Sequence, residues 1–163
     1  MDDLLFIDDG EEAKPPALSP ACNEAGWVVL VVDDDADVHA VTRMALHHFL
    51  FMGRPLQLVD CFSAREALAI LPTLPDLALI LLDVVMESED AGTRLARTIR
   101  ATPRYDHVQI IIRTAAGGYG GRGAFRDIPI HAFVWQSEVS KTRLESLVSS
   151  ALAAYCTASA APA

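Results

Sequence analysis

The sequence predicts an α/β fold in which helices cover both faces of a five-stranded, doubly wound parallel sheet. Five short apolar runs, dense in Val, Ile and Leu, lack the polar alternation of half-exposed strands and are typical of strands buried on both faces. Segments with apolar residues at helical spacing stand between these runs. The chain of 163 residues is 52% hydrophobic, which is enough to bury the core of one domain.

Polar residues close several of the runs that predict strands. Three aspartates follow the first run, Asp83 follows the third, and the fourth ends near Thr114. In chain order, the predicted strands are 27–32, 56–62, 77–82, 108–112 and 130–135.

Helical spacing and capping residues predict the helices between the strands. Ser63 and Glu66 form a capping box, Asp35 is placed to cap the first helix, and Ser140 is placed to cap the last. The predicted helices are 38–49, 64–71, 90–100 and a final helix after Ser140 with an apolar stripe as far as Tyr155.

The stretch 115–126 is rich in glycine where the pattern requires a fourth helix, and we expect at most a short, weakened one. Residues 118–123 also match the GxGxxG pattern of dinucleotide-binding loops. That reading requires a helix to begin there, and Pro129 follows too soon for one. We therefore interpret the stretch as a loop.

Composition changes at both ends of the chain. Residues 1–26 are acidic and then rich in proline and small residues, which predicts a disordered leader. Residues 27–156 form the predicted domain, and residues 157–163 are an alanine-rich stretch that we expect to be a disordered tail.

The charge balance limits the partners. With 22 Asp and Glu against 13 Lys and Arg, the net charge of −9 disfavours direct binding to nucleic acid or to an anionic membrane. The three cysteines lack metal-binding spacing and predict free thiols in a reducing compartment. The first residues lack the basic start of a signal peptide, and the longest apolar run, 77–82, is far shorter than the roughly 20 residues of a membrane span. We therefore expect a cytoplasmic protein.

Polar side chains gather at the carboxyl ends of the predicted strands, where ligands bind in open parallel sheets. Asp33 and Asp34 follow the first strand, Asp83 follows the third and Thr114 ends the fourth. Carboxylates brought together repel one another unless a cation compensates them, and hard oxygen ligands suit Mg²⁺. A carboxylate beside Mg²⁺ and a hydroxyl donor can accept a phosphoryl group.

Three segments, 31–35, 81–86 and 112–115, resemble the signature blocks of response-regulator receiver domains. The resemblance spans roughly residues 27–155. It implies the flavodoxin-like fold of these CheY-like domains, with strand order 2-1-3-4-5. The stretches 37–42 and 83–92 are similar to receivers found upstream of cyclic-di-GMP phosphodiesterase-type regulators, although no such output domain is present in this sequence.

The resemblance implies a role for each residue that matches the family's pattern. Asp83 would be the phosphoacceptor. Asp33 and Asp34 would hold Mg²⁺, together with Asp83 and the backbone carbonyl of Val85. Thr114 would supply the hydroxyl that contacts the phosphoryl group.

The resemblance also implies a switch and partners. Phe133 stands where the family has an aromatic residue whose rotamer reports activation. The donor would be a histidine kinase or a histidine phosphotransfer protein. The face formed by the fifth strand and the last helix would contact an output protein or a second copy of the chain.

One position departs from the family's pattern. Gln136 stands where the family has a lysine near the end of the fifth strand, and an amide is a weaker, uncharged donor. Lys141 is the nearest lysine along the chain, and we expect it to point to water. Gln136 and the glycine-rich stretch leave open a second hypothesis, a degenerate receiver that acts as a phosphorylation-independent binding or dimerisation module.

A third hypothesis, a phosphatase with an aspartate nucleophile, ranks last because that class requires a second aspartate where this chain has Val85. The leading prediction is a single receiver domain that accepts a phosphoryl group on Asp83 with Mg²⁺. We expect no enzymatic activity beyond its own phosphorylation and, at most, hydrolysis of its own aspartyl phosphate.

Overall fold

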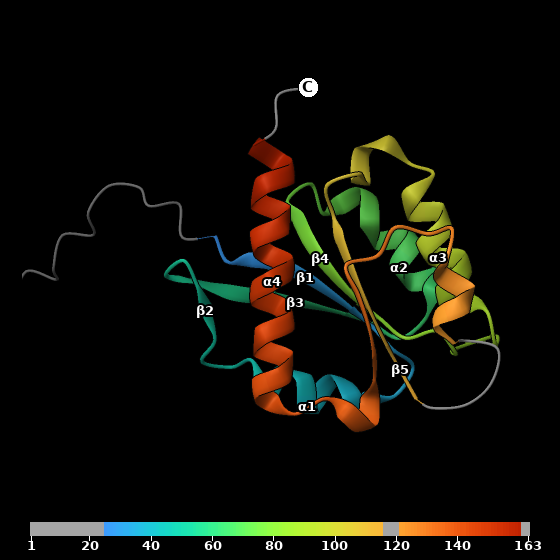
Figure 1. Cartoon of the computed structure of the whole chain (residues 1–163), viewed down its shortest axis with the longest axis horizontal. Helices are drawn as coiled ribbons and strands as arrows, with labels where there is room; N and C mark the ends of the chain where they lie inside the picture. Colours follow the sequence, from blue (N-terminus) through green and yellow to red (C-terminus); the bar gives the residue numbers. More distant parts are fainter. Residues whose placement is uncertain (1–24, 116–120, 161–163) are drawn as a thin grey trace, which may run out of the picture.

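The parallel sheet has β1 near its centre (Figure 1). The computed structural model describes residues 25–115 and 121–160 of the chain. The strand order is β2-β3-β1-β4-β5-β6. The strands are β1 (Trp27–Val32), β2 (Leu50–Phe51), β3 (Arg54–Cys61), β4 (Leu77–Leu82), β5 (Gln109–Thr114) and β6 (Ala132–Trp135). The five parallel strands thus have the predicted order 2-1-3-4-5, which confirms the predicted fold class.

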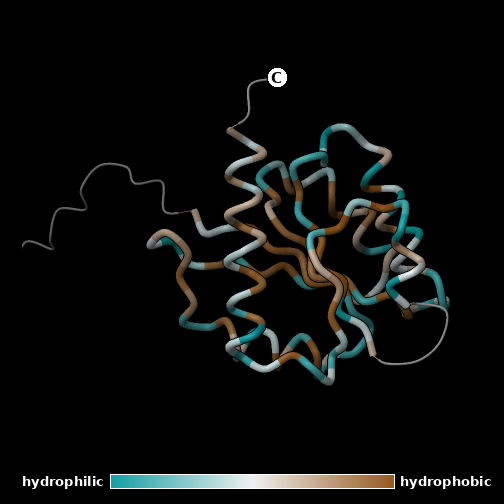
Figure 2. The backbone as a smooth tube through the Cα atoms, viewed as in Figure 1, coloured by the Kyte–Doolittle hydropathy of each residue, from teal (hydrophilic) through white to brown (hydrophobic). Residues whose placement is uncertain are grey.

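Helices cover both faces of the sheet. They are α1 (Ala36–Ala45), α2 (Ala64–Ile70), α3 (Ala91–Arg100) and α4 (Lys141–Ala160), joined by short 3₁₀ turns at Leu71–Thr73, Pro103–Tyr105, Arg122–Phe125 and Gln136–Glu138. One core cluster lies between the sheet and α2 and α3, and the other lies between the sheet and α4. The hydrophobic residues concentrate in the central strands (Figure 2).

Local capping explains where three of the helices begin. The Asp35 carboxylate accepts a hydrogen bond from the Asp37 N–H at 2.9 Å, as predicted for the start of α1. The Ser63 hydroxyl accepts from the Glu66 N–H at 3.0 Å at the start of α2. Ser140 accepts from the Arg143 N–H at 3.1 Å ahead of α4.

The predicted first helix, 38–49, was too long at its carboxyl end. Helix α1 ends at Ala45, and the chain turns into a hairpin in which β2 pairs antiparallel with the first residues of β3. Met52 and Gly53 form the turn with φ of 50° and 74°, the left-handed conformation that tight hairpins require. The indole of Trp27 donates to the Phe51 carbonyl at 2.9 Å and holds the hairpin against β1.

The weakened helix was predicted within 115–126, of which residues 116–120 lie outside the described residues. In the described part of the segment between β5 and β6, the only helical residues are the single 3₁₀ turn Arg122–Phe125. Phe125 anchors this turn, because its side chain is buried in the core.

The predicted disordered tail, residues 157–163, starts too early along the chain. Helix α4 continues to Ala160, so residues 157–160 are helical, because alanine favours helix and the Thr157 hydroxyl donates to the Ala153 carbonyl at 3.1 Å. Residues 161–163, and residues 1–24 of the expected leader, lie outside the described residues.

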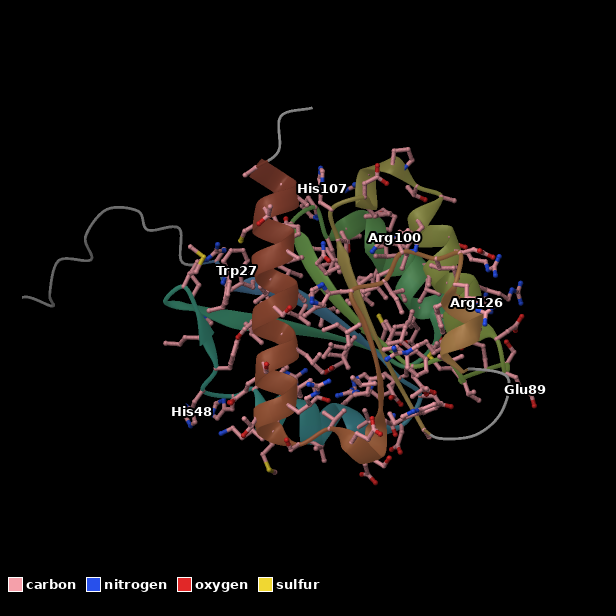
Figure 3. The ribbon with its side chains drawn as sticks, viewed as in Figure 1. Trp27, His48, Glu89, Arg100, His107 and Arg126 are labelled. Atoms are coloured by element: carbon pink, nitrogen blue, oxygen red, sulfur yellow. The ribbon has the colours of Figure 1, made fainter. Side chains whose placement is uncertain are left out.

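Charged and polar side chains surround this core. His48, Glu89, His107 and Arg126 are exposed at the periphery (Figure 3). Among residues 25–115 and 121–160, the structure has no helix with the length and apolar character needed to cross a membrane.

Candidate functional site

The carboxyl ends of β1, β4 and β5 meet at a cavity of about 350 Å³. It is lined by Asp33, Asp34, Asp35, Asp83, Val85, Thr114, Ala115 and Gln136. Six of the seven site residues predicted from the sequence therefore share one cavity. The position follows from topology, because the chain leaves β1 toward β3 on one side and returns to β4 on the other, and such a switch in strand order opens a crevice.

The sheet holds the two buried aspartates by their backbones. The Asp33 N–H donates to the Cys61 carbonyl at 3.1 Å, and the Asp83 N–H donates to the Val32 carbonyl at 2.9 Å. Each aspartate thus extends the hydrogen-bonding ladder by one residue beyond its strand. Their side chains are fixed at the sheet edge and are 2% and 8% exposed, respectively.

Asp33, Asp34 and Asp83 form an acidic cluster. One oxygen from each carboxylate lies within 4.8 Å of the others. Burial and the charge of Asp33 raise the pKa of Asp83 to about 6, although hydrogen bonds from Thr114 and the Val84 N–H favour its carboxylate. Burial also raises the pKa of Asp33. This cluster is short of positive charge, and its hard oxygen donors fit a divalent cation such as Mg²⁺.

Gln136 contributes a neutral donor to the cluster. Its amide Nε2 donates to Asp33 Oδ2 at 3.2 Å, while the Asp35 N–H donates to Asp33 Oδ1 at 2.9 Å. Both carboxylate oxygens of Asp33 therefore have a partner. Lys141 is exposed and lies 3.8 Å from the Glu145 carboxylate, one helical turn further along α4, and it is not among the residues that line the acidic cavity.

Gly92 fixes the loop between β4 and α3 against Asp83. Its N–H donates to the Val84 carbonyl at 2.8 Å. A Cβ atom at this position would lie 2.0 Å from the Asp83 carbonyl oxygen and 2.6 Å from the Val84 Cα. Only glycine permits this approach, so the backbone that carries Asp83 depends on it.

His39 was not predicted from the sequence as a site residue, yet it contacts the backbone of Asp33. Its Nε2 lies 2.7 Å from the Asp33 carbonyl oxygen, and its Nδ1 lies 2.8 Å from Asp60 Oδ1. The side chain is 5% exposed and joins α1 to β1 and β3. The His spacing gave no signal, because both partners are brought to it by the fold.

Arg113 is the second residue that the sequence reasoning missed. It precedes Thr114 on β5 and is 6% exposed, on the face covered by α1 and α4. Its Nη1 donates to Thr42 Oγ1 at 2.7 Å. A charged residue inside an apolar strand was the available signal.

Phe133 does not line the acidic cavity. It is 8% exposed within β6 and packs between Phe125 and Trp135, with ring centroids at 6.0 Å and 5.1 Å. The ring is therefore enclosed by aromatic neighbours.

No protein-family model matches the chain. A curated relative, the 3′3′-cGAMP-specific phosphodiesterase 2 of Vibrio cholerae, is 38% identical over 130 residues, which are 79% of this chain and 25% of that protein. The chain thus spans about a quarter of the length of that relative.

Solved structures share the fold. A response regulator receiver protein from Pseudomonas putida is 27% identical and superposes with a TM-score of 0.63 over 76% of this chain and 96% of that one. The Mn²⁺-bound form of the response regulator Rcp1 is 18% identical, with a TM-score of 0.62 over 74% and 88% of the two chains. The strand order, the acidic cluster at the strand ends and these likenesses together identify the chain as a receiver domain of the response-regulator type.

Proposed function

We propose that this receiver accepts a phosphoryl group on Asp83, in the presence of Mg²⁺, from a histidine kinase or a histidine phosphotransfer protein. The observation that carries the proposal is the position of the Asp83 carboxylate within 4.8 Å of Asp33 and Asp34, in a cavity that Thr114 also lines. A carboxylate placed in this way can act as a nucleophile toward phosphorus.

In this mechanism a carboxylate oxygen of Asp83 forms a bond to phosphorus as the bond from phosphorus to the donor nitrogen breaks. The electron pair of that bond leaves with the donor imidazole. Mg²⁺ would be held by Asp33, Asp34, Asp83 and the carbonyl of Val85. It would neutralise charge on the oxygens of the phosphoryl group. The Thr114 hydroxyl and the Gln136 amide, whose residues line the cavity, would donate to the phosphoryl oxygens.

Phosphorylation would change the charge at one end of the sheet. The aspartyl phosphate carries about −1.5 to −2 of charge in place of the −1 of the free carboxylate, and it offers three acceptor oxygens. Thr114 pairs with Trp135 across β5 and β6, so a shift of Thr114 toward the phosphoryl group would reach β6 and the ring of Phe133. We propose the face of β6 and α4 as the surface that contacts an output protein or a second copy.

Acetyl phosphate with Mg²⁺ tests the proposal by intact mass. We expect the unmodified protein to gain one phosphoryl group, and we expect Asp83→Asn or removal of Mg²⁺ to abolish the gain. Asp76→Asn is the matched control, because Asp76 is exposed in the turn before β4 and makes the same chemical change away from the cavity. Phosphorylation retained in Asp83→Asn would contradict the assignment of the acceptor.

The second candidate is a binding or dimerisation module that works without phosphorylation. Gln136 at the site favours it, as does the 3₁₀ turn that stands in place of an α-helix in the described residues between β5 and β6. Failure to gain mass with acetyl phosphate, together with failure to bind beryllofluoride in the presence of Mg²⁺, would favour this candidate over the first.

A further inference from the structure

Arg113 is a buried cation with few partners. Its side chain is 6% exposed, and the single hydrogen bond found for its guanidinium in the described residues goes to the Thr42 hydroxyl at 2.7 Å. That hydroxyl in turn donates to the Val38 carbonyl at 2.6 Å. Within the described part of the chain, no carboxylate lies within 4.0 Å of the guanidinium. A buried charge without a close counterion is costly, and its retention calls for a reason.

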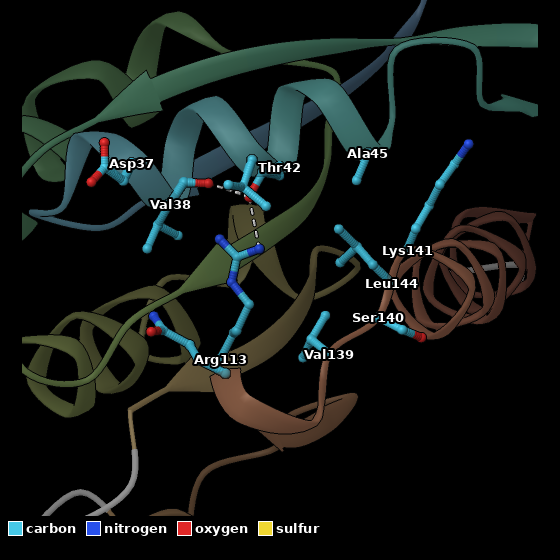
Figure 4. A pocket seen from close by; sticks show the side chains of 11 residues that line it. Asp37, Val38, Thr42, Ala45, Arg113, Val139, Ser140, Lys141 and Leu144 are labelled. Carbon is cyan, nitrogen blue, oxygen red and sulfur yellow. Dashed lines mark hydrogen bonds between the residues drawn. The ribbon is translucent and has the colours of Figure 1, made fainter.

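The guanidinium lies in a second cavity, of about 240 Å³, between α1 and the start of α4 (Figure 4). Gln136 lines both this cavity and the acidic one. Its amide donates to Asp33, so Gln136 belongs both to the wall of the cavity that holds the guanidinium and to the acidic cluster. Lys141 also lines the second cavity, but its ammonium points away from Arg113 in Figure 4.

The charge of Arg113 acts across Gln136 on the acidic cluster. Burial raises the pKa of Asp33, and the charge of Arg113 opposes that rise. Burial lowers the pKa of Arg113, and the charges of Asp33 and Asp83 oppose that fall. The cation and the two carboxylates thus lie within electrostatic reach, although they form no ion pair.

The acidic cavity itself lacks a positive charge for a phosphoryl group. Its described lining contains four aspartates and no lysine, arginine or histidine. A bound Mg²⁺ offsets two negative charges, whereas the other aspartates of the lining and a phosphorylated Asp83, which itself carries about −1.5 to −2, together bring more than two. The phosphorylated site would therefore keep a net negative charge that a nearby cation stabilises.

We propose that Arg113 is the positioning residue that supplies this positive charge, through or beside Gln136, and that it stabilises an anionic group bound to Asp83. The inference rests on the proposed function. It assigns the positive charge to Arg113 of β5, which lines the second cavity. Gln136 is neutral, and the Lys141 ammonium lies beside Glu145 and outside the acidic cavity, so neither residue supplies that charge.

The positive charge of Arg113 should favour the binding of an anion at the site and disfavour the binding of a cation. These opposite effects distinguish an electrostatic role from damage to the fold, which would weaken the binding of both. Removing the charge with Arg113→Met should weaken the binding of beryllofluoride, which stands in for a phosphoryl group on an aspartate, by about tenfold. The same change should strengthen the binding of Mg²⁺ alone. A variant that only loosens the site should weaken both.

The experiment measures the affinities for Mg²⁺ and for beryllofluoride with Mg²⁺ in the full chain, by calorimetry, with thermal melts to check folding. We expect Arg113→Lys to stay within about threefold of the unmodified chain, because it keeps the charge. We expect Gln136→Lys to restore beryllofluoride binding in the Arg113→Met background, because it returns a positive charge to the shared wall. If Arg113→Met does not fold, Arg113→Gln, which keeps a donor for Thr42, replaces it.

Unchanged beryllofluoride binding in Arg113→Met would overturn the inference. A parallel loss of both affinities without rescue by Gln136→Lys would also overturn it. Failure of the unmodified chain to bind beryllofluoride would instead refute the proposed function, so the two failures are distinguishable.

Discussion

Replacing Gly92 by alanine should lower the free energy of unfolding by at least about 3 kcal/mol, the upper range for overpacked sites. The new Cβ would meet the carbonyl oxygen of Asp83 at 2.0 Å and the Cα of Val84 at 2.6 Å. Both obstacles are backbone atoms at the end of a fully buried strand, so neither can move aside as a flexible side chain can. The loop must shift, and Asp83 shifts with it.

Urea denaturation and Mg²⁺ titration measure the two effects of Gly92→Ala together. We expect lower stability and weaker Mg²⁺ binding. Gly123→Ala is the matched control, because a Cβ at Gly123 meets no atom within 4 Å, and it should leave both quantities nearly unchanged. Equal stabilities of the two variants would show that the loop between β4 and α3 has more freedom than this packing implies.

In the absence of metal, Asp83→Asn should make the protein more stable at neutral pH by about 3 kcal/mol. The pKa of Asp83 is raised from 3.8 to about 6, mainly by burial. Between these values the folded state keeps a proton that the unfolded state releases, so stability falls as the pH rises. Each pKa unit corresponds to about 1.4 kcal/mol, and asparagine remains neutral throughout.

Urea denaturation at several pH values, with a chelator present, checks this result. The advantage of Asp83→Asn should be largest at pH 7.5 and shrink by about half at pH 5. Adding Mg²⁺ at pH 7.5 should stabilise the unmodified protein and narrow the gap. Asp76→Asn makes the same chemical change at an exposed position and is the control variant. An advantage that does not vary with pH would mean that the Asp83 carboxyl has an ordinary pKa.

The elements that could be predicted from the sequence are those that local residues specify. The buried strands appear as unbroken apolar runs, and the starts of α1 and α2 follow from Asp35 and Ser63, whose partners lie two and three residues away. The strand ends place Asp33 and Asp83 together once the strand order is given, and that order came from the resemblance to receiver domains. The predicted cluster and its cavity thus depended on local signals together with the strand order that the resemblance implies.

The hairpin at β2 could not be predicted in the same way. Its strand has two residues, and Phe49 beside it matched the helical spacing of α1. The contacts that stabilise the hairpin come from Trp27, whose indole bonds to Phe51 and whose ring lies 4.0 Å from the Arg54 guanidinium. These contacts join residues more than twenty positions apart.

Arg113 and His39 show the same limit at the site. Arg113 bonds to Thr42, 71 positions earlier, and His39 bonds to Asp60, 21 positions later. The alternation of side chains along β5 sets the face of the sheet on which Arg113 lies. The residues that surround its guanidinium come from α1 and α4, far away in the sequence. Local patterns specify the carboxylates of the site, whereas the fold specifies the groups that support them.

The burial of Cys61 beneath the site has a consequence for labelling chemistry. Burial raises the pKa of its thiol to about 11, and the side chain is 2% exposed. The thiolate is the reactive form, so Cys61 is nearly inert toward alkylating reagents while β3 stays paired with β1. Its carbonyl accepts the hydrogen bond from the Asp33 N–H, so a separation of β3 from β1 at Cys61 would also break this bond to the site. The modification rate of Cys61 thus reports how often β3 separates from β1 next to Asp33, without an engineered probe.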